Sequence, residues 1–99
     1  MPLLDSNKYH FSPLEGEPHR QNAVDSLFTY NVPKQCTRVA VQAVEENIRY
    51  TTNGTNPTAS SGFLLKAGDP PFLIEITPTT TLKFISETAG ALLEIEAGA

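Results

Sequence analysis

The feature that most constrains the fold is a series of short runs, between residues 37 and 97, in which apolar and polar residues alternate. Successive side chains of a β-strand point to opposite faces, so this alternation predicts strands that turn one face toward a core. Clusters of Gly, Pro, Asn, Asp, Ser and Thr separate the runs. About six strands at such a spacing predict an all-β fold, a small antiparallel β-sandwich or barrel. The expected strands are Thr37–Val44, Asn47–Thr52, Phe63–Lys66, Phe72–Thr77, Leu82–Ser86 and Ala91–Ala97.

The alternation also predicts which side chains point inward. Val39, Val41 and Ala43 share one face of the first expected strand, and Leu93 and Ile95 share one face of the last. Glu94 and Glu96 take the opposite face of that last strand, which is expected to lie at an edge of the sheet. The aromatic side chains of this region are all expected to point inward: Tyr50, Phe63, Phe72 and Phe84.

Two dipeptides are expected to make turns. Glu45-Glu46 joins the first two expected strands and predicts a tight hairpin. Asn53-Gly54 opens a polar loop that ends near Gly62, and both of its residues tolerate positive φ. Asn53-Gly54-Thr55 also matches a glycosylation sequon, but the turn accounts for the same residues.

Residues 1–36 differ in composition from the rest of the chain. They hold four of the eight prolines and both histidines, and their apolar residues occur singly. Proline at this density interrupts helices and is excluded from central strands. We therefore expect an extended N-terminal arm over residues 1–36 and a β-sandwich domain over residues 37–99.

The arm is either a disordered tail, or it clamps a neighbouring molecule or packs on its own domain, and the spaced aromatic residues favour the second alternative. As a clamp, it would contact its partner through its larger apolar side chains. For Leu27, Phe28 and Tyr30 the favoured alternative is that they complete the core of the domain. The expected partner-binding residues are Leu3, Leu4, Tyr9, Phe11, Phe28 and Tyr30.

Charge and hydropathy exclude several kinds of partner. The net charge is −4, and the seven Lys and Arg residues are scattered. Binding to nucleic acid or to an anionic membrane requires clustered cations, so neither is expected as a partner. Met1-Pro2-Leu3-Leu4 is followed directly by Asp5, and we therefore expect no signal peptide and no membrane span. The single Cys36 allows no intrachain disulfide, which suits assembly in a reducing cytoplasm.

No arrangement of residues points to catalysis. The glycines do not form a phosphate-binding loop. His10, His19 and Cys36 lie far apart in sequence, whereas zinc ligands usually come in pairs two to four residues apart. Nucleophilic catalysis needs a serine or cysteine beside a histidine in a fixed position, and both histidines lie in the expected arm, where such a geometry is hard to maintain. We expect no catalytic residue, no metal site, no cofactor and no enzymatic activity.

The segment Ile48–Thr58 reads Ile-Arg-Tyr-Thr-Thr-Asn-Gly-Thr-Asn-Pro-Thr. It resembles a strand and loop of the β-sandwich modules at the C-terminal ends of chitobiase-type glycosidases. The resemblance implies that Tyr50 anchors the strand in the core and that Pro57 ends strand pairing. Asn53 and Gly54 would make the intervening turn.

The longer stretch Val39–Ile95 resembles small proteins encoded among the head genes of tailed phages. The resembling segments are Asn47–Thr51, Gly62–Pro71 and Leu82–Ser86. This resemblance implies a virion structural protein, a capsid decoration or cement protein that is assembled in the host cytoplasm. It would be a homo-oligomer on the capsid surface, where it would bridge subunits of the major capsid protein.

Two alternatives remain open at this stage. One is a head–tail neck or tail structural protein of the same particle. The other is a carbohydrate-binding or host-surface module, which would need an exposed aromatic platform that the alternation does not predict.

Overall fold

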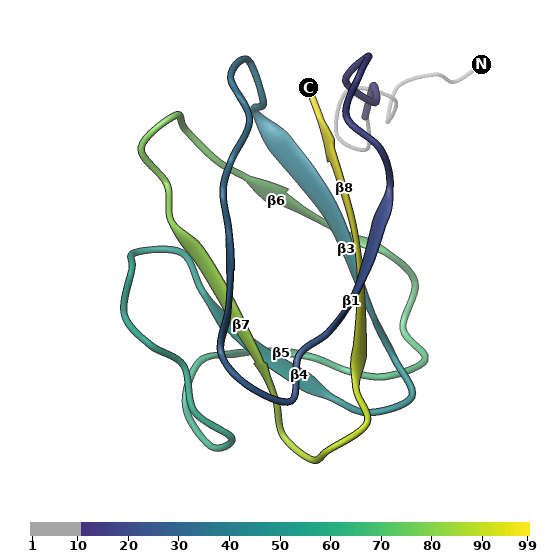
Figure 1. Ribbon diagram of the computed structural model, residues 1–99, viewed down its shortest axis with the longest axis vertical. Coiled ribbons are helices and arrows are strands. Elements are labelled where there is room, and N and C mark those ends of the chain that lie inside the picture. The colour runs from purple at the N-terminus through teal and green to yellow at the C-terminus, as the bar shows by residue number, and fades with distance from the viewer. Residues whose placement is uncertain (1–10) are drawn as a thin grey trace, which may run out of the picture.

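The computed structural model describes residues 11–99 as two antiparallel four-stranded sheets that face each other (Figure 1). The described residues contain eight strands. In chain order these are β1 (Arg20–Ala23), β2 (Phe28–Tyr30), β3 (Arg38–Val44), β4 (Ile48–Thr51), β5 (Phe63–Leu65), β6 (Phe72–Glu75), β7 (Leu82–Ser86) and β8 (Leu92–Gly98). The expected all-β sandwich is confirmed.

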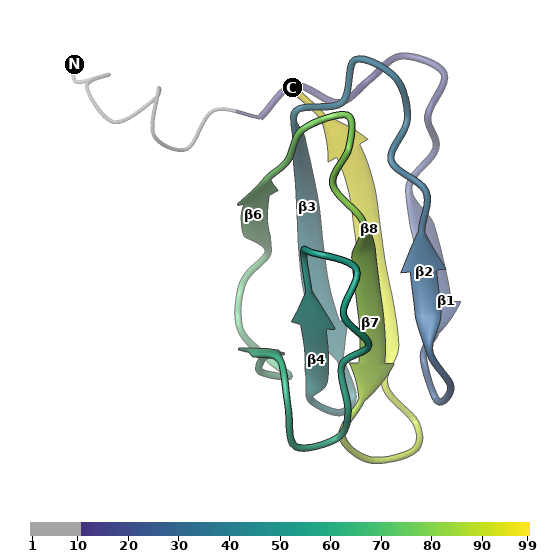
Figure 2. The ribbon, with the colours of Figure 1, turned by 90° about the vertical axis from the view of Figure 1, so that its left-hand side faces the viewer.

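The strand order places two edge strands at each open side of the sandwich. The first sheet has the order β1-β8-β3-β6, and the second has the order β2-β7-β4-β5. Strands β1 and β2 therefore lie at one side of the molecule, and β5 and β6 lie at the other (Figure 2). The central pair β3 and β8 is the longest ladder, with a register that runs from Arg38 opposite Gly98 to Val44 opposite Leu92.

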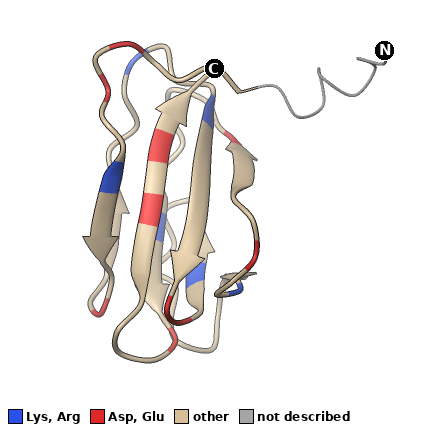
Figure 3. Cartoon of the chain, turned by 90° about the vertical axis from the view of Figure 1, so that its right-hand side faces the viewer, with Lys and Arg blue, Asp and Glu red and all other residues tan. Residues whose placement is uncertain are grey.

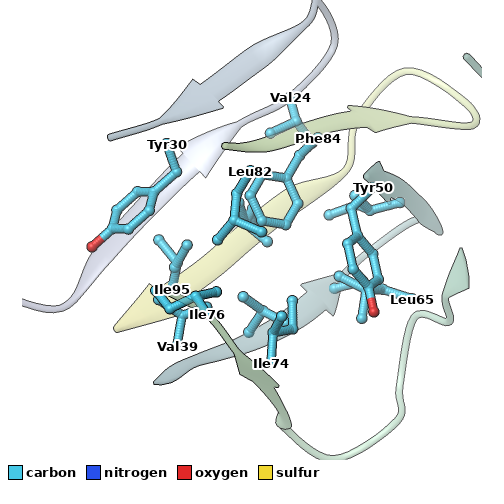
Figure 4. Packing of buried hydrophobic residues seen from close by; sticks show 14 of the residues in the cluster. Val24, Tyr30, Val39, Tyr50, Leu65, Ile74, Ile76, Leu82, Phe84 and Ile95 are labelled. Atoms are coloured by element: carbon cyan, nitrogen blue, oxygen red, sulfur yellow. The ribbon is translucent and has the colours of Figure 1, made fainter. Parts of the chain in front are cut away.

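The core lies between the sheets and follows the expected alternation. Val39 and Val41 of β3 and Leu93 and Ile95 of β8 are buried from the first sheet. Phe84 of β7 is fully buried from the second sheet. In Figure 4, Phe84 and Leu82 lie in the middle of the cluster, between Tyr30 at one end and Tyr50 at the other. Burial of this whole cluster between the two sheets is the main source of stabilisation for a chain of this size.

The fold contains eight strands rather than about six, and both additional strands lie within the predicted arm. Strand β1 pairs with β8, and β2 pairs with β7. The sequence of β1, Arg-Gln-Asn-Ala, has no alternation because it is an edge strand held by backbone hydrogen bonds. Strand β2 has three residues, too few to show a period. The sandwich therefore begins before the boundary expected at residue 36.

The connection at Glu45-Glu46 is not a hairpin, because β3 and β4 belong to different sheets. Glu45 has a φ of 78°, and the N–H of Glu46 donates to the carbonyl of Val44 at 3.0 Å. This turn carries the chain from one sheet to the other. Among the described strands, only β4 and β5 are consecutive in sequence and also neighbours in one sheet.

The chain ahead of β1 packs against the end of β8. The N–H of Ser12 donates to the carbonyl of Ala99 at 2.9 Å, and the N–H of Leu14 donates to that of Ala97 at 3.1 Å. No helix in residues 11–99 is long and apolar enough to cross a membrane.

Candidate functional site

The largest exposed apolar side chains lie at the open side of the sandwich, at the edge strands β5 and β6. The exposed fraction is 64% for Phe63, 52% for Phe72 and 43% for Leu64. Between the strands lies a hollow of about 430 Å³. We call this surface the β5–β6 mouth. Its rim includes Phe63, Leu64, Lys66, Asp69 and Phe72.

The position of Phe63 is set by its neighbour Gly62. Gly62 has a φ of 125°, and a Cβ atom there would lie 3.0 Å from the carbonyl oxygen of Tyr50 and 3.2 Å from Cβ of Pro57. This close packing places Phe63 opposite Tyr50 in the β4–β5 ladder. The two rings have centroids 5.5 Å apart, so Tyr50 supports one side of the exposed ring.

The position of Phe72 is set by the loop that precedes β6. The N–H of Asp69 donates to the carbonyl of Lys66 at 3.2 Å and closes a turn. The Nε2 group of Gln42, on β3, donates to the carbonyl of Asp69 at 3.1 Å. Two prolines then lead into β6, where Phe72 pairs with Val41. The far wall of the mouth is therefore tied to a central strand.

A second hollow, of about 440 Å³, also has Phe63 in its wall. It is lined by Thr51, Thr52, Asn53 and Thr55. The hydroxyl of Thr51 donates to the carbonyl of Thr55, and Oδ1 of Asn53 accepts from the N–H of Thr55 at 3.1 Å. The expected turn at Asn53-Gly54 is confirmed, with a φ of 86° at Gly54. Phe63 thus lines both hollows.

A cluster of charged and polar groups lies on the outer face of the first sheet, beside a small hollow that shares Gln42 and Pro71 with the mouth. Nε2 of His19 lies 2.5 Å from Oε1 of Glu94, and Nδ1 lies 3.4 Å from Oε1 of Glu96. Gln21 also donates to Glu94. Hydrogen bonds to the two glutamates raise the pKa of His19, and the bond from His19 lowers the pKa of Glu94.

This cluster differs from what the sequence suggested. Strand β8 is a central strand, so Glu94 and Glu96 do not guard an edge as expected. The two glutamates bind opposite nitrogens of the His19 ring and do not converge on one point. Among residues 11–99, no group of three His, Cys, Asp or Glu side chains is arranged to hold a metal ion.

The structure divides the six residues expected to bind a partner. Leu3, Leu4 and Tyr9 lie outside the described residues. Phe11 packs against Gly98 at the end of β8. Phe28 packs against Phe84 with ring centroids 6.3 Å apart and the rings tilted by 35°, and Tyr30 is buried in the core. Of the three residues expected to complete the core, Tyr30 is buried and Phe28 packs against the core, whereas Leu27 is 40% exposed.

The sequence reasoning missed Phe63 and Phe72 as exposed residues. It assigned their direction correctly, since Phe63 shares a face with the buried Leu65, and Phe72 shares a face with the buried Ile74. Both phenylalanines begin short edge strands at the open side of the sandwich. The expectation that all four aromatic side chains are inside was therefore wrong for these two. The sequence feature that could have indicated their exposure is their position: Phe63 directly follows Gly62, and Phe72 directly follows the Pro70-Pro71 turn.

Comparison with known families gives one match. Residues 28–93, two thirds of the chain, match the family model of the chitobiase/β-hexosaminidase C-terminal domain. The match runs from β2 into β8, so it includes both walls of the β5–β6 mouth. No curated protein and no solved structure matches the chain. The resemblance of Ile48–Thr58 to this family is confirmed, whereas the match says nothing of a phage particle. The chain belongs to the chitobiase/β-hexosaminidase C-terminal domain family.

Proposed function

We propose that this protein is a non-catalytic attachment module that binds other proteins through the β5–β6 mouth. The observation that carries the proposal is the joint exposure of Phe63, Leu64 and Phe72 on one side of the sandwich. Clustered exposed apolar side chains on a small domain mark an interaction surface, because leaving them in water is unfavourable.

The finer proposal is that this module is a structural component of a phage virion, a decoration protein on the outer surface of the capsid. Its support is the sequence resemblance of Val39–Ile95 together with the low share of charged residues, 18%. A surface poor in charge loses little hydration when it is covered by protein. The proposed partners are the major capsid protein and further copies of this chain, and each bound copy would add contact area between shell subunits.

A binding assay tests this proposal directly. Shells purified from the same source without this protein are mixed with the full chain and sedimented, and bound protein is quantified by mass spectrometry. We expect saturation at a simple fixed ratio to the major capsid protein, and greater resistance of the shells to heating. A ratio far below one copy per capsid subunit would instead indicate the neck or tail. Absence of binding, with no copies in native particles, would contradict a virion role.

Matched variants test the role of the mouth. Phe63→Ser and Phe72→Ser each remove one exposed ring, and both are expected to weaken shell binding. Leu27→Ser removes a comparably exposed apolar side chain, 40% exposed, that lies between β1 and β2. It is expected to bind as the unaltered protein does. Equal loss in all three variants would show that binding does not depend on the mouth.

A second candidate function is the binding of an amino-sugar glycan. It is favoured by the exposed ring of Phe63 next to the threonine and asparagine hollow, because sugar sites combine an aromatic face with hydroxyl and amide groups. The name of the family, which refers to chitobiase and β-hexosaminidase, agrees with this class of ligand.

The two candidates make different predictions for two side chains. Glycan binding requires Phe63 and Thr52 but not Phe72, because Phe72 does not line the second hollow. Protein binding requires Phe63 and Phe72 but not Thr52. Titration with chito-oligosaccharides, followed by amide NMR shifts in Phe63→Ser, Thr52→Val and Phe72→Ser, separates them. Absence of any shift in the unaltered protein would exclude the glycan.

A further inference from the structure

We propose that the β5–β6 mouth binds a second copy of this chain, and that the two copies are related by a twofold axis. This inference deepens the proposed function, since it names one partner of the same surface. Two features support it: the unpaired edge of β5 and the charges at the rim of the mouth.

Of the two edge strands at the mouth, β5 is the one open to pairing with another molecule, since β6 contains Glu75 and follows Pro70-Pro71. Strand β5 reads Phe-Leu-Leu, with neither charge nor proline, and among the described residues it pairs only with β4. Edge strands that remain exposed usually carry such features. On the opposite side β1 carries Arg20, and β2 is uncharged, but Phe28 is only partly exposed and Tyr30 is buried, whereas Phe63 and Leu64 of β5 are exposed. The side with β5 therefore suits a covered surface.

The charges at the rim favour a copy of the same chain over other proteins. Lys66 and Asp69 stand at the two ends of one turn, both exposed, and within residues 11–99 neither has an ion-pair partner. In a twofold interface each surface meets itself, so Lys66 of one copy can approach Asp69 of the other. One positive and one negative charge on the same rim are self-complementary.

The net charge of the chain supports the same conclusion. Copies that carry −4 each repel one another, and they associate best through a face that is itself neutral. The rim of the mouth has one cation and one anion, whereas the burial pattern of β8 places Glu94 and Glu96 on the outer face of its sheet. The two acidic positions of the strand that ends at the C-terminus are red in Figure 3. A basic partner would prefer that acidic face. The neutral, apolar mouth fits a second copy better.

The test measures the oligomeric state of the full chain by sedimentation equilibrium, with no shell present. We expect a concentration-dependent dimer. Lys66→Asp and Asp69→Lys should each raise the dimer dissociation constant on the order of tenfold, since an exposed pair is weak but occurs twice in a twofold interface. Lys34→Asp makes the same charge change at an exposed site away from the mouth and should leave the constant unchanged.

Charge exchange provides the decisive readout. A mixture of the K66D chain and the D69K chain should form a heterodimer more readily than either chain pairs with itself. The double variant that carries both substitutions should dimerise as the unaltered protein does. Thermal unfolding of each variant shows that it is folded.

Three outcomes would overturn the inference: a monomer at all concentrations, a dimer that ignores the charge variants, or a dimer that survives Phe63→Ser with Phe72→Ser. A monomer that nevertheless binds shells would overturn the second copy and leave the proposed function standing. A dimer with the expected charge dependence that binds no shell would support the inference and contradict the virion role.

Discussion

The ring of His19 bridges from the start of the first sheet to Glu94 on β8, with Nε2 of His19 2.5 Å from Oε1 of the glutamate. His19 directly precedes β1, and Arg20 is opposite Ile95 in the ladder. The ion pair therefore adds a side-chain contact to a short edge strand that has little apolar area of its own.

The stability of the domain is expected to depend on pH through this pair. The pKa of His19 is raised above 6.5, so its contribution is complete below that value and is lost as pH rises through the higher folded pKa. The pKa of Glu94 is lowered from 4.5, so its contribution is complete above that value and is lost as pH falls through the lower folded pKa. Both contributions are complete between 4.5 and 6.5.

Urea unfolding of the unaltered protein and of His19→Ala checks this prediction. The variant should be less stable at about pH 5.5 by up to about 1 kcal/mol, the range for solvent-screened pairs, and the difference should shrink near pH 8.5. Glu46→Gln removes an exposed carboxylate and serves as the control. A difference that does not change with pH would show that His19 acts only by packing.

Gly62→Ala is expected to destabilise the domain by about 1–3 kcal/mol, because the residue has positive φ and no room for a side chain. Gly68→Ala is the matched control, since Gly68 has a φ of 92° but nothing within 4 Å of the added atom. Chemical denaturation of both variants separates backbone strain from the clash with Tyr50. Equal losses would show that the contact with Tyr50 contributes nothing.

Asn47→Ala is expected to loosen the loop that carries the mouth. Oδ1 of Asn47 accepts from the N–H of Ala67 at 2.8 Å, and its Nδ2 donates to Glu87 at 3.2 Å. Arg49 also donates to Glu87, at 2.7 Å. The loss should be about 1–3 kcal/mol, because the N–H of Ala67 is left without its partner.

Amide hydrogen exchange at Ala67 reports this loss directly, since its protection should fall in the Asn47 variant. Asn56→Ala is the control, because the side chain of Asn56 accepts a single bond, from Lys83, and is exposed. Unchanged exchange at Ala67 would show that the loop does not depend on Asn47.

The sequence predicted the part of the fold that depends on alternation. The inward faces of β3 and β8 and the strand Leu82–Ser86 agree with the structure, because each is buried on one side only. It could not predict β1 and β2, which are held by pairing with distant strands. It also could not show that Glu45-Glu46 crosses between sheets, since a turn sequence specifies a change of direction and not the partner of the next strand.

The candidate site was harder to predict for a related reason. Alternation gives the direction of a side chain, but exposure depends on whether the opposite sheet extends over it. Phe63 and Phe72 point as expected and are still exposed, because both lie at the ends of short edge strands. His19 and Glu94 are 75 residues apart, and only the β1–β8 pairing brings them together.

Gly98→Ala is expected to detach the segment that precedes β1 from the end of β8. An added Cβ would lie 2.3 Å from Cε1 of Phe11 and 2.6 Å from the carbonyl oxygen of Ser12. The ring can move away, but the backbone oxygen cannot move without breaking the Ser12–Ala99 hydrogen bonds, each 2.9 Å long. The protection of the Ala99 amide against hydrogen exchange should therefore be lost.

Phe11→Ala provides the control for this prediction, because it removes the ring and leaves Gly98 and the backbone pair in place. Its Ala99 amide should remain largely protected. Combining Phe11→Ala with Gly98→Ala should not restore protection, since the clash with the Ser12 carbonyl persists. Full protection in the combined variant would mean that the ring of Phe11, and not the backbone of Ser12, requires glycine at this position.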